Sequence, residues 1–183
     1  MATNTIESKV FSIDDARDTL DRIILFINNC DNKASIMLGI LGAILTVFLT
    51  GSGIDTLNNI LNLITNNLTF GGLILLIIMI VSVIIFFFGL YKLISVIVAK
   101  IRISENDSKI YFRDIAENES LELYRLKLLD MDENGILNNL IAEIYINSKI
   151  CSSKFKKYNC GLRLSIIGLV TFVSFFLIGT ICF

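Results

Sequence analysis

The sequence predicts an all-α membrane protein, with three transmembrane helices and a small cytoplasmic helical bundle. Three apolar stretches carry this prediction because none of them contains a charged residue: Ala34–Ile54, Gly71–Leu90 and Leu164–Phe183. Each has about 20 residues, the length that an α-helix needs to cross the ~30 Å hydrocarbon layer. The composition agrees, with 54% hydrophobic residues and a mean hydropathy of +0.72.

The basic residues predict the orientation of these stretches in the membrane. All 16 Lys and Arg residues lie before the first stretch or between Lys92 and Arg163. Residues 51–70, which we interpret as a loop, contain no basic residue and one acid, Asp55. The positive-inside rule therefore places the N-terminus and residues 104–160 in the cytoplasm, and residues 51–70 and the C-terminal Phe183 outside.

Residues 1–33 are expected to form a cytoplasmic, amphipathic N-terminal helix. Ser12 and Asp15 have the spacing of a capping box, and the apolar residues that follow recur on one helix face. Nothing in the sequence ends this helix before Thr50. Residues 34–103 then form a transmembrane hairpin, with spans at about 34–54 and 71–91 and a second helix that continues to about Arg102.

The cytoplasmic insert, residues 104–160, is expected to pack with the N-terminal arm as a helical bundle. We predict a helix from about Glu117 to Leu129, a turn over Asp130–Gly135, and a helix from about Ile136 that runs into the third span, residues 161–183. The turn resembles the first half of an EF-hand loop. Ile141 occupies the place of the bidentate Glu, so a capped turn is predicted in place of a calcium site.

Small residues recur at helical spacing in the first span. They are Ser35, Gly39, Gly42 and Ala43. Small residues one turn apart let membrane helices approach closely, which would give a contact within the chain or between subunits. Ordinary use of small residues in membrane helices explains the same pattern, and both interpretations stay open here.

The composition argues against an enzyme. The chain has no His, no phosphate-binding Gly loop and no charged residue inside a span, which also disfavours an ion-coupled transporter. The four Cys residues form no Cys-x-x-Cys pair, so we interpret them as reduced thiols and predict no metal site and no cofactor. The net charge of −1 gives no reason to expect binding to duplex nucleic acid.

Two short polar motifs stand out beside the spans. Asp31-Asn-Lys-Ala-Ser35 lies where the first helix enters the bilayer, and Tyr111-Phe-Arg-Asp-Ile-Ala116 lies in the insert. Unpaired charge close to hydrocarbon is costly, so Asp31 and Lys33 are expected to have partners.

These motifs, together with the late helix Leu140–Ile150 and the lysines after it, resemble the Pycsar effector transmembrane family of bacterial antiphage defence. The resemblance covers roughly residues 13–180 in order and topology. It implies a multi-pass protein of the bacterial inner membrane that senses a cyclic pyrimidine nucleotide, cUMP or cCMP, made by a partner cyclase. It also implies that the activated homo-oligomer disrupts the membrane, as a pore or by damage to the lipid, and causes growth arrest or cell death.

A cyclic mononucleotide needs cations for its phosphate and an aromatic face for its base. The candidate ligand-binding residues are Asp31, Lys33, Tyr111, Phe112, Arg113, Asp114, Lys154, Lys157 and Tyr158. The lysines near the membrane would equally suit anionic lipid headgroups, and Tyr111 and Phe112 would equally suit the core of the bundle. A different function also stays open, that of a small membrane anchor or regulatory subunit that recruits a protein partner through its cytoplasmic bundle.

Overall fold

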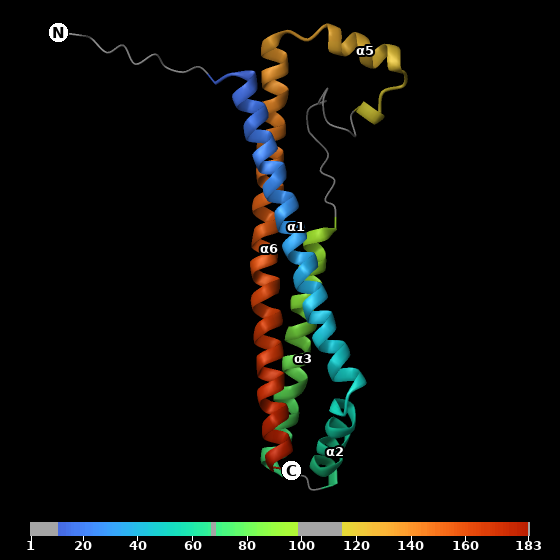
Figure 1. Ribbon diagram of the computed structural model, residues 1–183, viewed down its shortest axis with the longest axis vertical. Helices are drawn as coiled ribbons and strands as arrows, with labels where there is room; N and C mark the ends of the chain where they lie inside the picture. The colour runs from blue at the N-terminus through green and yellow to red at the C-terminus, as the bar shows by residue number, and fades with distance from the viewer. Residues whose placement is uncertain (1–10, 67–68, 99–114, 183) are drawn as a thin grey trace, which may run out of the picture. The chain divides into compact units, whose positions relative to one another are not determined.

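The computed structural model describes residues 11–66, 69–98 and 115–182, and in these ranges the chain is all-α with no strand. Figure 1 shows the five helices that these ranges contain, namely α1 (Ile13–Thr50), α2 (Gly53–Asn66), α3 (Phe70–Ile97), α5 (Leu121–Leu129) and α6 (Glu133–Cys182). The all-α prediction is confirmed.

Three of the described helices, α1, α3 and α6, are long and apolar enough to cross a membrane. In the most apolar 18-residue part of each helix, only 11% (α1), 28% (α3) and 17% (α6) is buried inside the molecule. Exposed apolar surface on this scale is unfavourable in water and favourable in hydrocarbon. The chain is therefore a membrane protein with three predicted spans, as its hydropathy indicates.

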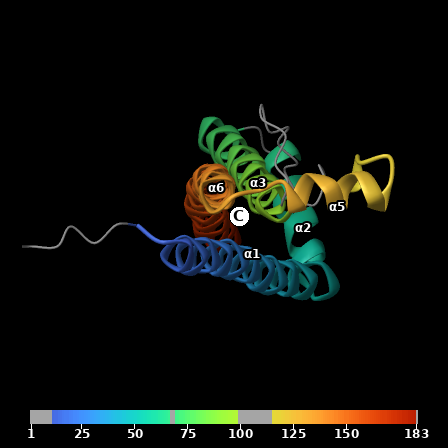
Figure 2. The same cartoon turned by 90° about the horizontal axis from the view of Figure 1, so that it is seen from above.

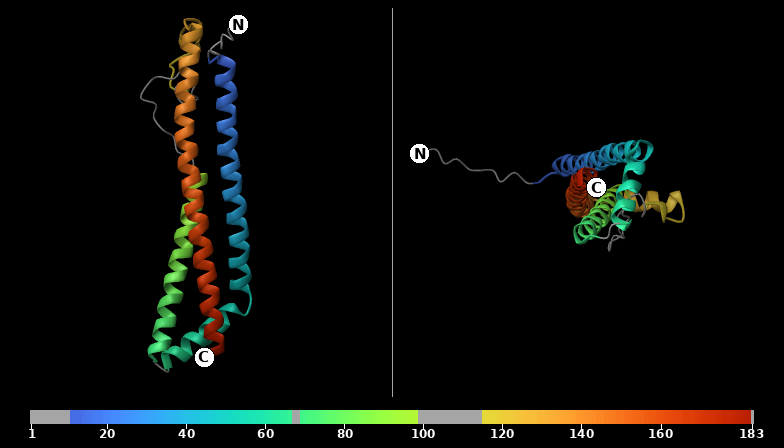
Figure 3. Two further views of the ribbon diagram at one scale, coloured as in Figure 1. Left: turned by 90° about the vertical axis from the view of Figure 1, so that its left-hand side faces the viewer. Right: turned by 90° about the horizontal axis from the view of Figure 1, so that it is seen from below.

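The chain divides into two compact units. The first unit consists of Met1–Ile27 and Lys100–Ser152, and the membrane unit consists of Asn28–Ala99 and Ser153–Phe183. Within the membrane unit, α1, α3 and α6 lie side by side and α2 packs against α3 (Figures 1 and 2). Within the first unit, the beginnings of α1 and α6 run next to each other (Figure 3), and Ala16, Leu140 and Glu143 are buried.

The capping box at the start of α1 is confirmed. The Asp15 amide donates to Ser12 Oγ at 3.1 Å, and the Ser12 amide donates back to Asp15 Oδ2 at 3.1 Å. These two bonds satisfy amide groups that a helix N-terminus otherwise leaves without partners. The helix then continues to Thr50 without interruption, as the sequence predicts.

The interpretation of residues 51–70 as a loop is wrong, because most of this segment forms α2. Ile60 and Ile64 are buried against Leu75 and Met79 of α3. These two isoleucines are four residues apart and so share one face of the helix, while Asn and Thr residues occupy other positions. We missed the helix because its apolar face is short and alternates with residues typical of turns. An amphipathic helix of this kind suits the boundary between hydrocarbon and water.

Three predicted helix boundaries are corrected by the structure. The α3 helix ends at Ile97 and not near Arg102, because Val98 has an extended backbone with φ −61° and ψ 121°. The helix predicted from Glu117 begins at Leu121, where the Ser120 hydroxyl accepts a hydrogen bond from the Leu123 amide at 3.2 Å. The last helix begins at Glu133, three residues before its predicted start. The predicted capped turn is present, because Asp132 Oδ1 accepts a hydrogen bond from the Gly135 amide at 2.8 Å.

Glycines bring the backbones of α3 and α6 into contact. A Cβ atom at Gly89 would lie 2.4 Å from the Ser165 backbone nitrogen, and one at Gly168 would lie 2.5 Å from the Phe86 nitrogen. No side chain fits in such a space, so these positions must be Gly. Close approach of this kind stabilises helix pairs in lipid, where burial of apolar surface contributes little.

The small residues predicted to pack the first span, Ser35, Gly39, Gly42 and Ala43, are exposed on α1. A Cβ atom at Gly39 or Gly42 would meet nothing within 4 Å. Among the described residues, therefore, no other helix of the same chain lies against these two glycines. Contact between subunits through this face stays a prediction.

Gly89→Ala is expected to destabilise the protein, because the new methyl group would overlap the backbone of Ser165. Overpacking of this kind costs about 1–3 kcal/mol, which lowers the melting temperature by several degrees in a protein of this size. The measurement is thermal unfolding of the purified protein in detergent, followed by circular dichroism. Gly71→Ala, at an exposed position of the same helix where the new methyl group meets nothing within 4 Å, is the matched control and should leave the melting temperature unchanged or slightly raised. Equal effects of the two substitutions would contradict the α3–α6 contact.

Candidate functional site

A buried lysine joins three helices of the membrane unit. The Lys154 ammonium group of α6 donates to both carboxylate oxygens of Asp31 on α1, at 2.6 and 2.7 Å, and to the Val96 carbonyl oxygen of α3 at 2.8 Å. A lysine has three N–H donors, so these contacts use all of them. The Lys154 side chain is 11% exposed and the Asp31 side chain 29% exposed. We call Asp31, Lys154, Lys157, Tyr158 and the carbonyls of Ser95 and Val96 the Lys154 cluster.

The position of the cluster follows from where α3 ends. Ser95 and Val96 lie in the last turn of α3, whose carbonyl groups have no amide partners within the helix. Lys157 donates to the Ser95 carbonyl at 3.3 Å, next to the bond between Lys154 and Val96. The last turn of α3 contains no basic residue of its own. Two lysines of α6 therefore supply the positive charge that stabilises this negative helix end.

Apolar residues surround the ion pair on the protein side. Cys30, Ala34 and Val96 are completely buried, and Phe155 and Tyr158 pack against them. The Tyr158 ring also contacts a second apolar cluster that includes Leu41 and Phe86. Such surroundings lower the local dielectric constant, which strengthens a charge pair and raises the cost of breaking it.

The structure brings four of the predicted ligand-binding residues together. These residues, all in the Lys154 cluster, are Asp31, Lys154, Lys157 and Tyr158. A partner was expected for Asp31, and in the structure this partner is Lys154. Lys33 is exposed on α1 and takes no part in the cluster. Tyr111, Phe112, Arg113 and Asp114 lie outside the described residues. The carbonyl groups of Ser95 and Val96 were missed, because backbone acceptors leave no trace in a sequence unless the end of their helix is known.

Polar side chains are also held in the first unit. Asn147 donates to the Glu143 carbonyl at 2.9 Å and to its carboxylate at 3.3 Å, and Glu143 is only 6% exposed. The Lys149 ammonium group lies 4.1 Å from the centre of the Tyr145 ring, which is cation–π geometry. None of these four residues was among the candidate ligand-binding residues, because the sequence around them has the pattern of an amphipathic helix. Burial raises the pKa of the nearby Cys151 thiol above its ordinary value.

The Lys154 cluster is suited to exchange one anion for another. It contains an ammonium group paired with a carboxylate, and a second ammonium group beside it. A phosphate group has the same preference for ammonium donors as a carboxylate. Because all three donors of Lys154 are in use, an added anion can bind it only by displacing Asp31 or the Val96 carbonyl. Such an exchange would break a contact between α6 and either α1 or α3.

The family model of the Pycsar effector protein domain matches residues 15–180. A Pycsar effector protein of Gulbenkiania mobilis is 31% identical over 178 residues, an alignment that covers 87% of this chain and 89% of that protein. No solved structure matches significantly.

Lys154→Met is expected to destabilise the membrane unit by about 2 kcal/mol, since it leaves the Asp31 charge without its partner. The loss should be smaller than for a fully buried pair because 29% of the Asp31 side chain is exposed. Lys156→Met, at an exposed position on the same helix, is the control. Adding Asp31→Asn to Lys154→Met should recover part of the loss. Thermal unfolding in detergent measures these three variants and Asp31→Asn alone, and additive effects of the two substitutions would contradict the pairing.

Proposed function

The chain belongs to the Pycsar effector protein family, whose members are effectors of antiphage defence, and on that premise we propose what activates it and what it does. A cyclic pyrimidine nucleotide, cUMP or cCMP, binds on the cytoplasmic side. The activated protein then disrupts the bacterial inner membrane, without catalysing a reaction, and growth stops. A partner cyclase makes the nucleotide upon infection.

The distribution of charge supports the cytoplasmic position of the sensor. The segment from Lys92 to Arg163 holds most of the 16 basic residues, whereas residues 51–70 hold none. The positive-inside rule then puts residues 104–160 and the N-terminal arm in the cytoplasm, where a cyclase product would be found. Residues 111–114, with Lys33, remain the proposed contacts for the base and the phosphate.

The Lys154 cluster is the observation that carries the proposed mechanism. It joins one residue from each of the three long helices α1, α3 and α6 at a single ammonium group, beside the predicted spans. In our proposal the nucleotide phosphate competes with Asp31 for Lys154, beside the ammonium group of Lys157, and the contact between α1 and α6 is lost. A ligand shifts a conformational equilibrium only if it binds one arrangement better than the other. Here the difference in affinity comes from the lysine donors, which become available to phosphate only after Asp31 has left.

A pore would require more than one subunit, because three helices cannot enclose a path for water. We propose that subunits meet through the exposed face of α1 that carries Ser35, Gly39, Gly42 and Ala43. The Ser35 hydroxyl donates to the Asp31 carbonyl of its own helix at 3.0 Å, so its polar group is satisfied in lipid before any contact forms. Small side chains on this face would allow two copies of α1 to approach closely.

Cells that produce this chain together with a uridylate or cytidylate cyclase are expected to lose their membrane potential when the cyclase is active. Lys154→Met should abolish the dependence on the nucleotide, either by blocking the response or by depolarising cells without a cyclase. Lys156→Met, matched in charge and position along α6, should respond like the parent chain. Depolarisation is measured with a potential-sensitive dye, and protein in the membrane fraction is quantified for each variant.

An intact membrane potential in cells that contain both the active cyclase and the parent chain would overturn the proposed function. Stable co-purification with a second protein, together with that intact potential, would instead support the role of a membrane anchor or regulatory subunit. A shift in melting temperature with cUMP or cCMP, absent with the matching linear nucleotides, separates binding of the ligand from damage to the membrane.

A further inference from the structure

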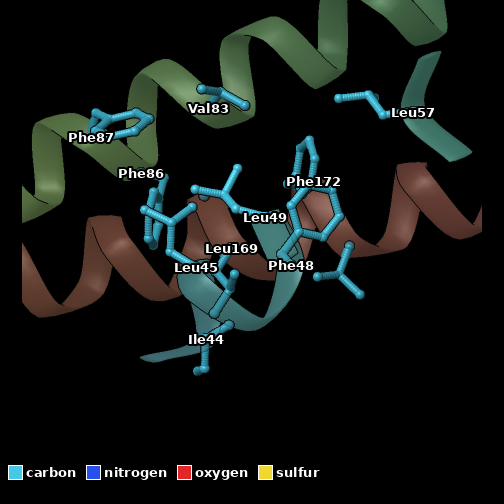
Figure 4. Close-up of a pocket in the computed structure, with 12 residues that line it drawn as sticks. Ile44, Leu45, Phe48, Leu49, Leu57, Val83, Phe86, Phe87, Leu169 and Phe172 are labelled. Atoms are coloured by element: carbon cyan, nitrogen blue, oxygen red, sulfur yellow. The ribbon is translucent and has the colours of Figure 1, made fainter. Parts of the chain in front are cut away.

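An apolar pocket of about 290 Å³ lies within the membrane unit, between α1, α3 and α6 and beside Leu57 of α2 (Figure 4). Its floor is buried, since Phe86 is 6% exposed and Gly168 has no room for a side chain. Residues at its rim are exposed, among them Leu49 at 50% and Phe87 at 53%. The pocket therefore opens on the outer surface of the helices.

The pocket lies deep in the predicted spans. Leu45, one of its lining residues, is near the middle of the apolar stretch Ala34–Ile54. At a rise of ~1.5 Å per residue it is roughly 16 Å along α1 from Ala34 and roughly 8 Å from the end of α1 at Thr50. The medium outside the pocket mouth is then the hydrocarbon of the bilayer. A water-soluble ligand would have to cross lipid to reach it.

The chemistry of the walls selects an apolar occupant. Every lining residue is Ile, Leu, Val, Phe or Gly, so no side chain could hydrogen-bond a water molecule. An empty pocket would lose van der Waals contacts along its whole lining. An apolar cavity of about 150 Å³ holds a benzene ring, so this pocket has room for roughly twice that volume. Phe48 and Phe172, with ring centres 5.4 Å apart, stiffen one wall.

We propose that this pocket binds one acyl chain of a membrane phospholipid. A chain of methylene groups is flexible enough to follow the pocket and is present at high concentration on every side of it. A side chain from a second subunit is a weaker candidate, because the small-residue face of α1 proposed for subunit contact does not line the pocket. The bound chain would fill the space between α1 and the α3–α6 pair.

A single introduced tryptophan tests this site, because the chain contains none. Phe86→Trp places the indole at the floor of the pocket. The protein, purified in detergent, is titrated with a phospholipid whose acyl chains carry bromine, which quenches tryptophan fluorescence on contact. We expect quenching that saturates near one lipid per subunit and that the unbrominated lipid reverses by competition.

Four further variants control for other causes of quenching. Ile84→Trp, at a position 61% exposed, should be quenched in proportion to the bulk lipid, without saturation, and Met79→Trp, at a position 5% exposed outside the pocket, should barely be quenched. Adding Val83→Phe, which fills the pocket rim, should reduce the saturable quenching of Phe86→Trp severalfold. Val81→Phe, on the same helix but outside the pocket, should leave it unchanged.

The proposal fails if Phe86→Trp behaves like Met79→Trp or like Ile84→Trp. It also fails if Val83→Phe changes the number of subunits per particle, because a second copy would then be the occupant. Phospholipid with a photoreactive acyl chain, crosslinked to the unsubstituted protein and mapped by mass spectrometry, serves if the Trp variants do not fold. Crosslinks at residues 44–49 and 168–173 are expected, and labelling spread evenly along the spans would overturn the site.

Discussion

The arrangement of the three spans depends on one ammonium group. Lys154 and Asp31 are 123 residues apart in the sequence, yet their side chains meet at 2.6 Å, and the same ammonium group also holds the carbonyl of Val96. The contact therefore fixes the positions of α1, α3 and α6 relative to one another along the helix axes. It also helps to determine where α3 ends, because a lysine takes the carbonyl that a longer helix would pair with its own amide. Removing the lysine would take this donor from both the Asp31 carboxylate and the Val96 carbonyl.

Inside the hydrocarbon, close packing of the helices stabilises the structure in place of charge pairs. The backbones of α3 and α6 touch at Gly89 and Gly168, and this approach leaves the Ser165 hydroxyl completely buried with no hydrogen-bond partner among the described residues. A buried hydroxyl without a partner costs about 1–3 kcal/mol. The close packing of the two backbones must offset that cost. The apolar pocket lies beside this pair, so the membrane unit combines one tight contact with one loosely filled space.

Much of the fold could be predicted from the sequence, because the bilayer allows few solutions. The length of the uncharged stretches and the capping box at Ser12 were sufficient to predict the long helices. Which faces pack could not be read in the same way. The small residues of the first span have the spacing of a packing face as clearly as Gly161, Ser165 and Gly168 of α6 do, and nothing local distinguishes a face that meets a helix from one that meets lipid. Asp31 stood out because charge close to hydrocarbon is rare, whereas Lys154 was named only as a cation suited to phosphate or to lipid headgroups.

The amphipathic α2 helix has a consequence for how the protein sits in bilayers of different thickness. Residues 51–70 contain no Trp, Tyr, Lys or Arg, the side chains that fix a helix end at the lipid headgroups. The opposite edge has Tyr91 and Lys92 at the end of the second apolar stretch, and Arg163 just before the third. The spans are thus anchored at one interface and unanchored at the other. In a thinner or thicker membrane the helices would pivot about the basic edge, and α2 would rise or sink with the lipid surface at little cost.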